Sequence, residues 1–340
     1  MNMQIKNIND KKLWEELISR YSPQSFFQSW TWGESVRLTG PNTQVWRIAL
    51  VTGDGEIAGL SQIVKVVARR GIHLHLRHGP VLKNWKRKSF HFLLEYIKRL
   101  ALREKAAFIR FGPLIENTPD HLALFKKAGF VDAPIHRMNG EFCWVLDLDK
   151  NADELLKNMR KTTRYLIKKA TNMGVIIRRS ESPGDMAIFN KLYEITAKRH
   201  GFVRHREVKW EFEKFVKEKK ALLFLGEFEG EIKSAAVIIF YNHQAIYHHS
   251  ASIEQKIPVN YLLQWHVILE AKKRNMKIYN FWGIAPDENP RHPWTNLTIF
   301  KKGFGGRTVE YLHAQDLPVN ILGYTKSYLL DYGRKLLKGY

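Results

Sequence analysis

Cysteine is almost missing from this sequence. Cys143 is the only one among 340 residues, which excludes an intramolecular disulfide and any zinc site built on several thiolates. Long apolar runs are missing too, because no stretch reaches the roughly 18 residues of a membrane-spanning helix and the first residues lack a signal-peptide core. These absences predict a protein of the reducing cytoplasm.

The motifs of common nucleotide and metal enzymes are absent as well. The sequence contains no P-loop, no HExxH, no GxSxG and no GxGxxG pattern. It has 14 histidines, and His248 and His249 are adjacent, but no second group of ligands stands at metal spacing. The sequence therefore predicts neither a metal nor a cofactor.

Basic residues are abundant. Lys and Arg number 55 against 33 Asp and Glu, a formal net charge of +22, and both halves of the chain share the excess. Such a surplus attracts polyanions, so phosphate-rich partners are expected. The hydrophobic content of 44% is that of a folded globular chain, and the length favours two domains.

The sequence repeats itself. Gly-Glu-Ile occurs at 55–57 and 230–232, each inside a predicted β-hairpin, and Phe-Lys-Lys occurs at 125–127 and 300–302. Both pairs have the same offset of 175 residues, and a predicted amphipathic helix and strand lie between the anchors in each half. The pattern predicts two tandem α/β domains with mixed sheets that arose by internal duplication.

The domain boundary is expected near residue 150, giving domains 1–150 and 151–340. Asn151 and Glu154 form the pattern of a capping box, so the second domain should open with a basic helix over 152–173 that ends at Gly174. Between Lys157 and Arg179 no acidic residue occurs, which favours phosphate contact over a merely solvated surface.

A hairpin followed by strand, helix and strand resembles the N-acetyltransferase (GNAT) architecture. Such enzymes bind acyl-CoA pyrophosphate on a glycine-rich loop at a helix N-terminus. No glycine occurs between Glu231 and Trp282, and the loop before the predicted helix of the first half offers only Gly79, which Pro80 follows. We therefore expect a donor other than acyl-CoA.

Several stretches together resemble the FemABX family, which adds amino acids from aminoacyl-tRNA to peptidoglycan precursors. They are FFQSWTWGE (26–34), RHGPVL (77–82), MRKTTRYLIKKATNMGV (159–175), KLYEITAKRHGF (191–202) and IYNFWGI with HPWTNLTIFKKGFGG (278–306). The family's twin GNAT-like domains agree with the repeat. The resemblance implies an aminoacyltransferase of cell wall biogenesis and cell shape, with no cofactor.

The resemblance also implies site residues. Phe300 and Lys301 match the family's Phe-Lys pair, whose lysine would steady the tRNA acceptor end or the oxyanion of ester aminolysis. A second set would contact the phosphates and peptide of the precursor: Arg37, Arg206, Trp210, Tyr247 and Trp282. Arg204 is the alternative to Arg206 as the phosphate-binding arginine. The tRNA backbone would contact a third set: Arg160, Lys161, Arg164, Lys168 and Lys302.

One position departs from the family. Gly112 stands before Pro113 where a carboxylate is common, so the general base is open between Asp287, Glu288, the substrate and water. The last residues, 321–340, combine aromatic, leucine and basic positions and suit either a membrane surface or a docked helix.

The expected partners are aminoacyl-tRNA and a nucleotide- or lipid-linked muropeptide, with peripheral contact at the cytoplasmic membrane face if the acceptor is lipid-linked. The alternatives are an N-acyltransferase that uses acyl-CoA or acyl-carrier protein, and a non-catalytic tRNA-binding protein.

Overall fold

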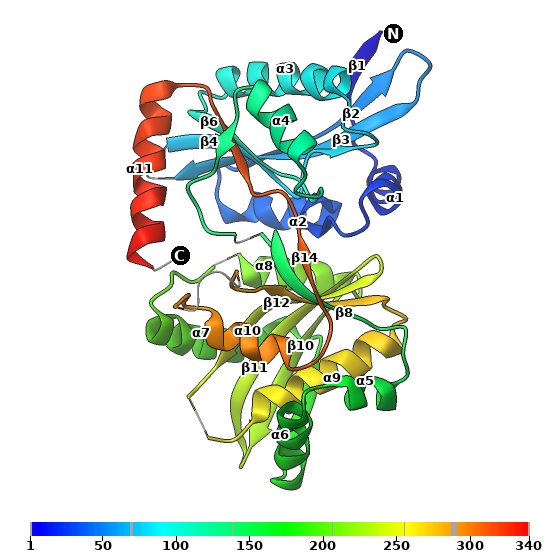
Figure 1. Ribbon diagram of the computed structural model, residues 1–340, viewed down its shortest axis with the longest axis vertical. Helices are drawn as coiled ribbons and strands as arrows, with labels where there is room; N and C mark the ends of the chain where they lie inside the picture. Colours follow the sequence, from blue (N-terminus) through cyan, green and yellow to red (C-terminus); the bar gives the residue numbers. More distant parts are fainter. Residues whose placement is uncertain are drawn as a thin grey trace. The chain divides into compact units, whose positions relative to one another are not determined.

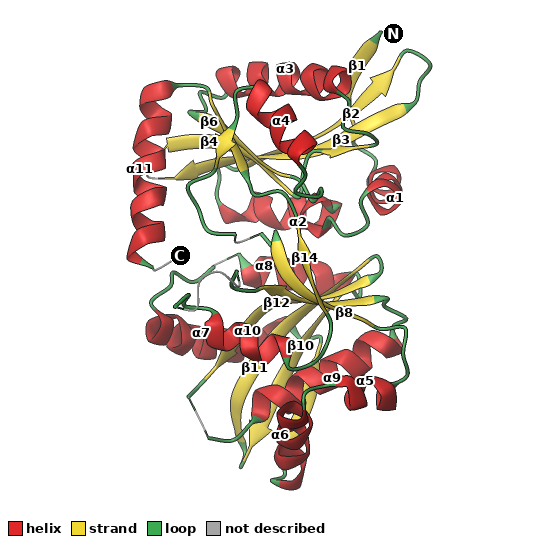
Figure 2. Cartoon of the chain, viewed as in Figure 1, coloured by secondary structure: helices red, strands yellow, loops and turns green. Residues whose placement is uncertain are grey.

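The computed structural model describes residues 2–68, 71–137, 139–205, 207–254, 256–286 and 291–338. The chain divides into two compact units. Unit 1 comprises residues 1–142, 285–293 and 310–340, and unit 2 comprises residues 143–284 and 294–309. Each unit is built on one mixed β-sheet with helices on its faces (Figures 1 and 2).

The sheet of unit 1 has the strand order β1-β2-β3-β4-β6-β15-β7, and β5 pairs with β3. Its strands have these bounds: β1 Met3–Asn7, β2 Gln44–Thr52, β3 Ile57–Ala68, β4 Gly71–Arg77, β5 Val81–Leu82, β6 Phe108–Gly112, β7 Val131–Asp132 and β15 Gln315–Pro318. Its helices have these: α1 Lys11–Tyr21, α2 Trp30–Val36, α3 Arg87–Arg103, α4 Pro119–Lys127 and α11 Ile321–Leu337. Helices α3 and α4 cover one face of this sheet, and α1 and α2 lie on the other (Figure 1).

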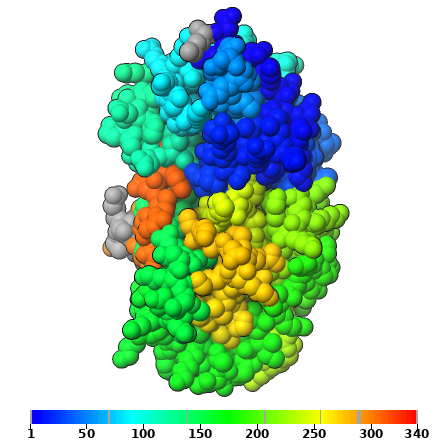
Figure 3. Space-filling view, turned by 90° about the vertical axis from the view of Figure 1, so that its right-hand side faces the viewer, coloured from blue at the N-terminus to red at the C-terminus, as the bar shows by residue number. Residues whose placement is uncertain are grey.

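The sheet of unit 2 has the order β14-β8-β13-β12-β11-β10-β9. Its strands have these bounds: β8 Phe142–Asp147, β9 Ile176–Ser180, β10 Ala221–Phe228, β11 Glu231–Tyr241, β12 Gln244–Ser252, β13 Ile278–Gly283 and β14 Arg307–Glu310. Its helices have these: α5 Ala152–Asn158, α6 Lys161–Asn172, α7 Met186–His200, α8 Val208–Lys217, α9 Val259–Lys273 and α10 Thr295–Lys302. The surface of α9 is seen in gold in Figure 3.

The two sheets have the same pattern. In each, three antiparallel strands lead to a parallel neighbour across a helix, β4 to β6 through α3 and β12 to β13 through α9. Each sheet then adds one antiparallel strand beside that neighbour, β15 in unit 1 and β8 in unit 2. The duplication predicted from the 175-residue offset is therefore present in the strand order.

The end of the predicted second domain is assigned differently by the structure. Residues 310–338 belong to unit 1, because β15 pairs with β6 and Tyr324 of α11 packs on Phe108 with ring centroids 5.4 Å apart. Conversely, β8 pairs with β13 in unit 2 although it precedes residue 150. The periodicity of a strand predicts that it pairs, but does not show with which sheet.

The single helix predicted over 152–173 is two helices. The predicted capping box is present, since Asn151 Oδ1 accepts from the Glu154 amide at 2.9 Å and Glu154 Oε2 accepts from the Asn151 amide at 3.1 Å. The chain then becomes extended at Met159, whose side chain is buried in the core of unit 2. Arg164 donates to the carbonyl groups of Lys157 and Met159 and so satisfies the end of α5.

Helix α6 ends at the predicted place, beside Gly174 with its left-handed φ of +83°. Its buried residues Thr163, Ile167 and Ala170 are spaced three or four positions apart and so form one apolar side of the helix. Helices α6 and α9 pack against each other, and α9 contacts β10 and β11. Helices α7 and α8 also contact this sheet, α7 on β11 and β12 and α8 on β10. The basic side of α6 is left at the surface.

Candidate functional site

The strands β12 and β13 separate within unit 2. They pair over only three positions, from Gln244 with Ile278 to Ile246 with Asn280. The corresponding strands of unit 1, β4 and β6, pair over five positions. Beyond Asn280, β13 also leaves its regular register with β8, and β12 contains a bulge. Bulges and broken pairing re-aim side chains, so the carboxyl end of β13 is where functional groups are expected.

Trp282 occupies this broken end of β13 in a strained conformation. Its φ is +69°, a left-handed value that is rare for a bulky side chain. Asn280 Oδ1 accepts a hydrogen bond from the Trp282 amide at 2.8 Å and holds the turn. The indole lies edge-on to His248, with ring centroids 6.0 Å apart. The predicted substrate-binding residue Trp282 is thus presented by a backbone geometry that the sequence did not reveal.

Lys301 reaches the same end of β13 from the last turn of α10. It is only 4% exposed, and Nζ donates to the Gly283 carbonyl at 2.5 Å. Burial lowers the pKa of Lys301 to about 7, and burial raises the pKa of the neighbouring Cys143 thiol to about 12. Among the described residues no carboxylate pairs with Lys301. An anion beside this amine would therefore raise the pKa of Lys301 and keep the amine protonated.

The first repeat places its lysine differently. Lys126 stands at the same position of the Phe-Lys-Lys motif, but its side chain is exposed at the end of α4. Phe125 is fully buried in the core of unit 1, whereas Phe300 is only partly buried and packs edge-on against Tyr261 at 4.9 Å. The structure therefore gives Phe300 a packing contact beside Lys301, and its predicted catalytic role stays a prediction.

The turn after Lys301 contacts the start of α6. The Gly303 carbonyl accepts from the Arg160 amide at 2.9 Å, and a side chain at Gly303 would collide with Thr163 of α6. Lys302 lies over Trp144, with Nζ 5.5 Å from the ring centroid. Arg160, Lys161 and Lys168 are exposed and form no ion pair among the described residues. The five residues predicted to contact tRNA therefore lie at the start of α6, along α6 and at the adjoining end of α10.

The other predicted residues are scattered. Arg37 lies in unit 1, where Glu34 and the Val45 carbonyl occupy its guanidinium at 3.4 Å and 2.8 Å. Tyr247 packs against the core of unit 2, and burial raises its pKa. Trp210 is partly exposed on α8. Arg204 lies 3.9 Å from Glu194. Arg206, Asp287 and Glu288 lie outside the described residues, and the phosphate and base roles stay predictions.

Sequence reasoning missed Glu211. This glutamate is 2% exposed on the apolar side of α8, and its Oε2 lies 2.6 Å from His248 Nε2. Its neighbours on that side of the helix are Val208, Phe212 and Phe215, all buried. A carboxylate at a helix position reserved for apolar residues needs a partner, and this was the available signal.

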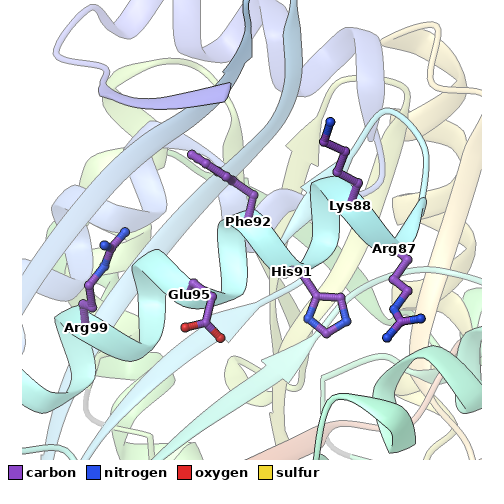
Figure 4. A pocket seen from close by; sticks show the side chains of 6 residues that line it. All are labelled: Arg87, Lys88, His91, Phe92, Glu95 and Arg99. Carbon is purple, nitrogen blue, oxygen red and sulfur yellow. The ribbon is translucent and has the colours of Figure 1, made fainter. Parts of the chain in front are cut away.

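A shallow hollow of about 550 Å³ lies elsewhere, on the solvent side of α3 in unit 1. Figure 4 shows that all its lining side chains project from that one helix: Arg87, Lys88, His91, Phe92, Glu95 and Arg99. A hollow lined from a single helix lacks the convergent polar groups of a typical substrate site. The end of β13 is therefore the stronger candidate.

Solved structures define the class of fold. A crystal structure of FemX superimposes with a TM-score of 0.81 at 20% identity and covers 96% of this chain and 100% of that one. A tandem GNAT protein from the clavulanic acid biosynthesis pathway gives 0.62 at 11% identity, covering 94% and 99%. The chain consists of two tandem GNAT-like domains.

The family model of the FemAB family matches residues 129–218 and 204–331, more than half of the sequence. The chain belongs to the FemAB family. Lipid II:glycine glycyltransferases of Staphylococcus aureus strains MRSA252 and USA300 are 31% and 30% identical over 182 residues. These alignments span 51% of the chain and 42% of the length of each relative.

Proposed function

We propose that this protein transfers an amino acid from aminoacyl-tRNA to an amine of a lipid-linked peptidoglycan precursor, as one step of interpeptide bridge formation. The observation that carries the proposal is the direct connection between Lys301 and the unneutralised basic side of α6 through Gly303. One element offers a buried amine and the next offers a surface for a polyanion. The names of the relatives, glycyltransferases acting on lipid II, support the acceptor.

The reaction is the aminolysis of an ester. The acceptor nitrogen attacks the ester carbonyl carbon, a C–N bond forms, and the carbonyl oxygen becomes an oxyanion. The C–O bond to the terminal ribose then breaks, and the proton lost by the amine ends on the ribose hydroxyl. A protonated Lys301 beside the oxyanion would lower the barrier, because a fixed cation in a buried site stabilises developing charge strongly.

Acyl-CoA is a poorer fit as donor. The helices that would receive its pyrophosphate, α3 and α9, begin after Lys86 and Pro258, and no glycine-rich loop precedes either of them. Pro258 also lacks the amide hydrogen that a phosphate would accept. The basic surface of α6 instead suits the regular phosphates of an RNA helix.

The donor is tested with labelled glycine on charged tRNA and purified lipid-linked precursor. We expect label on the precursor, and we expect the double variant Lys161→Ser/Lys168→Ser to raise KM for aminoacyl-tRNA about 10-fold with a shallower salt dependence, because fewer phosphates are neutralised. The matched control is Lys209→Ser/Lys217→Ser on α8, which should transfer like the wild type. A parallel assay supplies a labelled acyl-CoA in place of the charged tRNA, and label transferred only from acyl-CoA would overturn the proposal.

The lipid-linked acceptor further implies contact with a membrane surface, and α11 supplies it. This helix buries Tyr324, Ser327 and Asp331 and exposes a leucine stripe on its other side, with Leu322 85% and Leu329 63% exposed. Its only acidic residue, Asp331, is buried beside Arg110, so the exposed charges are all basic: Lys326, Arg334 and Lys338. Apolar and basic positions together suit an anionic bilayer. Within the ranges that the structure describes, no helix is both long and apolar enough to cross one.

Vesicle sedimentation tests this surface. We expect the full chain to bind vesicles rich in phosphatidylglycerol and to bind pure phosphatidylcholine weakly. The variant Leu322→Ser/Leu329→Ser/Leu336→Ser should bind at least about 10-fold more weakly, since each leucine contributes apolar area. The control Leu102→Ser/Leu122→Ser changes exposed leucines of α3 and the adjacent α4. Equal losses in both variants would contradict a role for α11.

A further inference from the structure

The bulge in β12 places two histidines on one side of the strand. Val237 of β11 pairs with His249 and Ile238 pairs with Tyr247, which leaves His248 as the extra residue. Neighbouring side chains of a regular strand point to opposite faces. Here the rings of His248 and His249 lie 4.1 Å apart between centroids. The bulge therefore brings two imidazole groups together.

Glu211 approaches the same two rings from α8. It is buried among the phenylalanines of that helix, where an ionised carboxylate is costly unless an opposite charge or hydrogen bond accompanies it. Its Oε2 lies 2.6 Å from His248 Nε2, and one donor atom from each of Glu211, His248 and His249 lies within 4.8 Å of the other two. Two elements far apart in the sequence thus converge on one point.

We propose that Glu211, His248 and His249 bind a divalent metal ion of the zinc type. Two imidazoles and one carboxylate are a donor set that proteins use for zinc, with a fourth position left to water or substrate. Imidazole ligands disfavour magnesium and calcium, which take oxygen donors. The proposal departs from the expectation that no metal binds, which rested on the lack of a second group of ligands near His248 in the sequence.

The distances are compatible with an ion after small side-chain rotations. Zinc ligands at about 2.0 Å in a tetrahedron lie about 3.3 Å from one another, between the 2.6 Å of the His248 and Glu211 pair and the 4.8 Å limit of the cluster. Tyr193 lies edge-on to His249, with centroids 5.9 Å apart, and His205 lies 5.5 Å from it. These rings restrict the orientation of His249, as the surroundings of a ligand must.

Metal analysis of the 340-residue chain tests the site without any transfer assay. After chelator treatment and dialysis, the chain is titrated with Zn²⁺ against a chromophoric chelator, and Co²⁺ is added separately to record its visible spectrum. We expect one equivalent of Zn²⁺, a Co²⁺ spectrum of four-coordinate type, and a higher melting temperature with metal. Glu211→Gln and His249→Gln should each weaken binding by about 100-fold or more.

A second histidine and glutamate pair supplies the matched control. His313 Nδ1 lies 2.7 Å from Glu141 Oε2 in unit 1, and His313→Gln should retain the full equivalent of metal. His249 is only partly buried, so His249→Gln should keep the wild-type circular dichroism spectrum. Less than a tenth of an equivalent in the wild type would overturn the proposal, and so would unchanged affinity in both site variants. If the wild-type chain binds zinc but transfers no amino acid in the assay described above, only the proposed function is contradicted.

Discussion

Lys301→Met is expected to abolish most of the transfer activity while leaving the protein folded. Methionine keeps the length of the buried side chain and removes the charge that would face the oxyanion. Removing one such electrostatic contact costs about 10²–10³ in kcat. KM for aminoacyl-tRNA should change little, because the surface of α6 is untouched. The measurement is single-turnover transfer from charged tRNA to the lipid-linked precursor.

Lys301→Met should also change how the free energy of unfolding depends on pH. The pKa of Lys301 is about 7 when folded and 10.5 in its ordinary state, so between these values the unfolded chain binds more protons than the folded one. Stability should therefore rise as the pH increases through this window, and the cost of burying the cation is present in full below it. Lys301→Met should lose this part of the pH dependence and be at least as stable as the wild type at neutral pH.

Lys126→Met is the matched control, because this lysine stands in the same motif of the first repeat but is exposed. Its transfer rate and urea midpoint should equal those of the wild type across the pH range. If Lys301→Met transfers at the wild-type rate, Lys301 takes no part in the chemistry. If its urea midpoint keeps the wild-type slope against pH, the buried amine is not the source of that slope.

The sequence predicts the internal repeat, but it does not predict which sheet β8 and β15 join. A fixed offset of 175 residues and the capping box at Asn151 are local signals, and local signals predict element order and helix starts. The pairing of β8 with β13 and of β15 with β6 depends on contacts between distant segments, which no periodicity encodes. The break at Met159 was hidden for the same reason, because the Arg160 amide finds its partner at Gly303.

The candidate site shows the same division. Lys301 was found through a motif, yet that motif occurs twice, and only the structure distinguishes the buried Lys301 from the exposed Lys126. The bulge at His248 and the left-handed backbone of Trp282 have no signature in residue type. Glu211 lies 37 residues before His248, so its contact with that histidine is visible only once α8 packs on the sheet.

The second large effect is expected at Arg110, which holds the C-terminal segment on unit 1. Its guanidinium donates two hydrogen bonds of 2.7 Å to Asp316 of β15 and one of 3.4 Å to Asp331 of α11, and all three side chains are buried. Arg110→Met would leave two buried carboxylates without their cation. The free energy of unfolding should fall by about 3–5 kcal/mol, as measured by urea denaturation.

The repair variant separates the ion pair from packing. Arg110→Met/Asp316→Leu/Asp331→Leu removes all three charges and should recover most of the lost stability, because apolar residues can replace a buried ionic group. The control Arg137→Met breaks a partly exposed pair with Glu310 and should cost less than about 1 kcal/mol. If Arg110→Met is no more harmful than this control, the buried triad does not anchor the segment. If Arg110→Met is more harmful than this control, we expect limited proteolysis to cut α11 first. The variant should then also bind vesicles more weakly, because α11 and its leucine stripe no longer pack against β6.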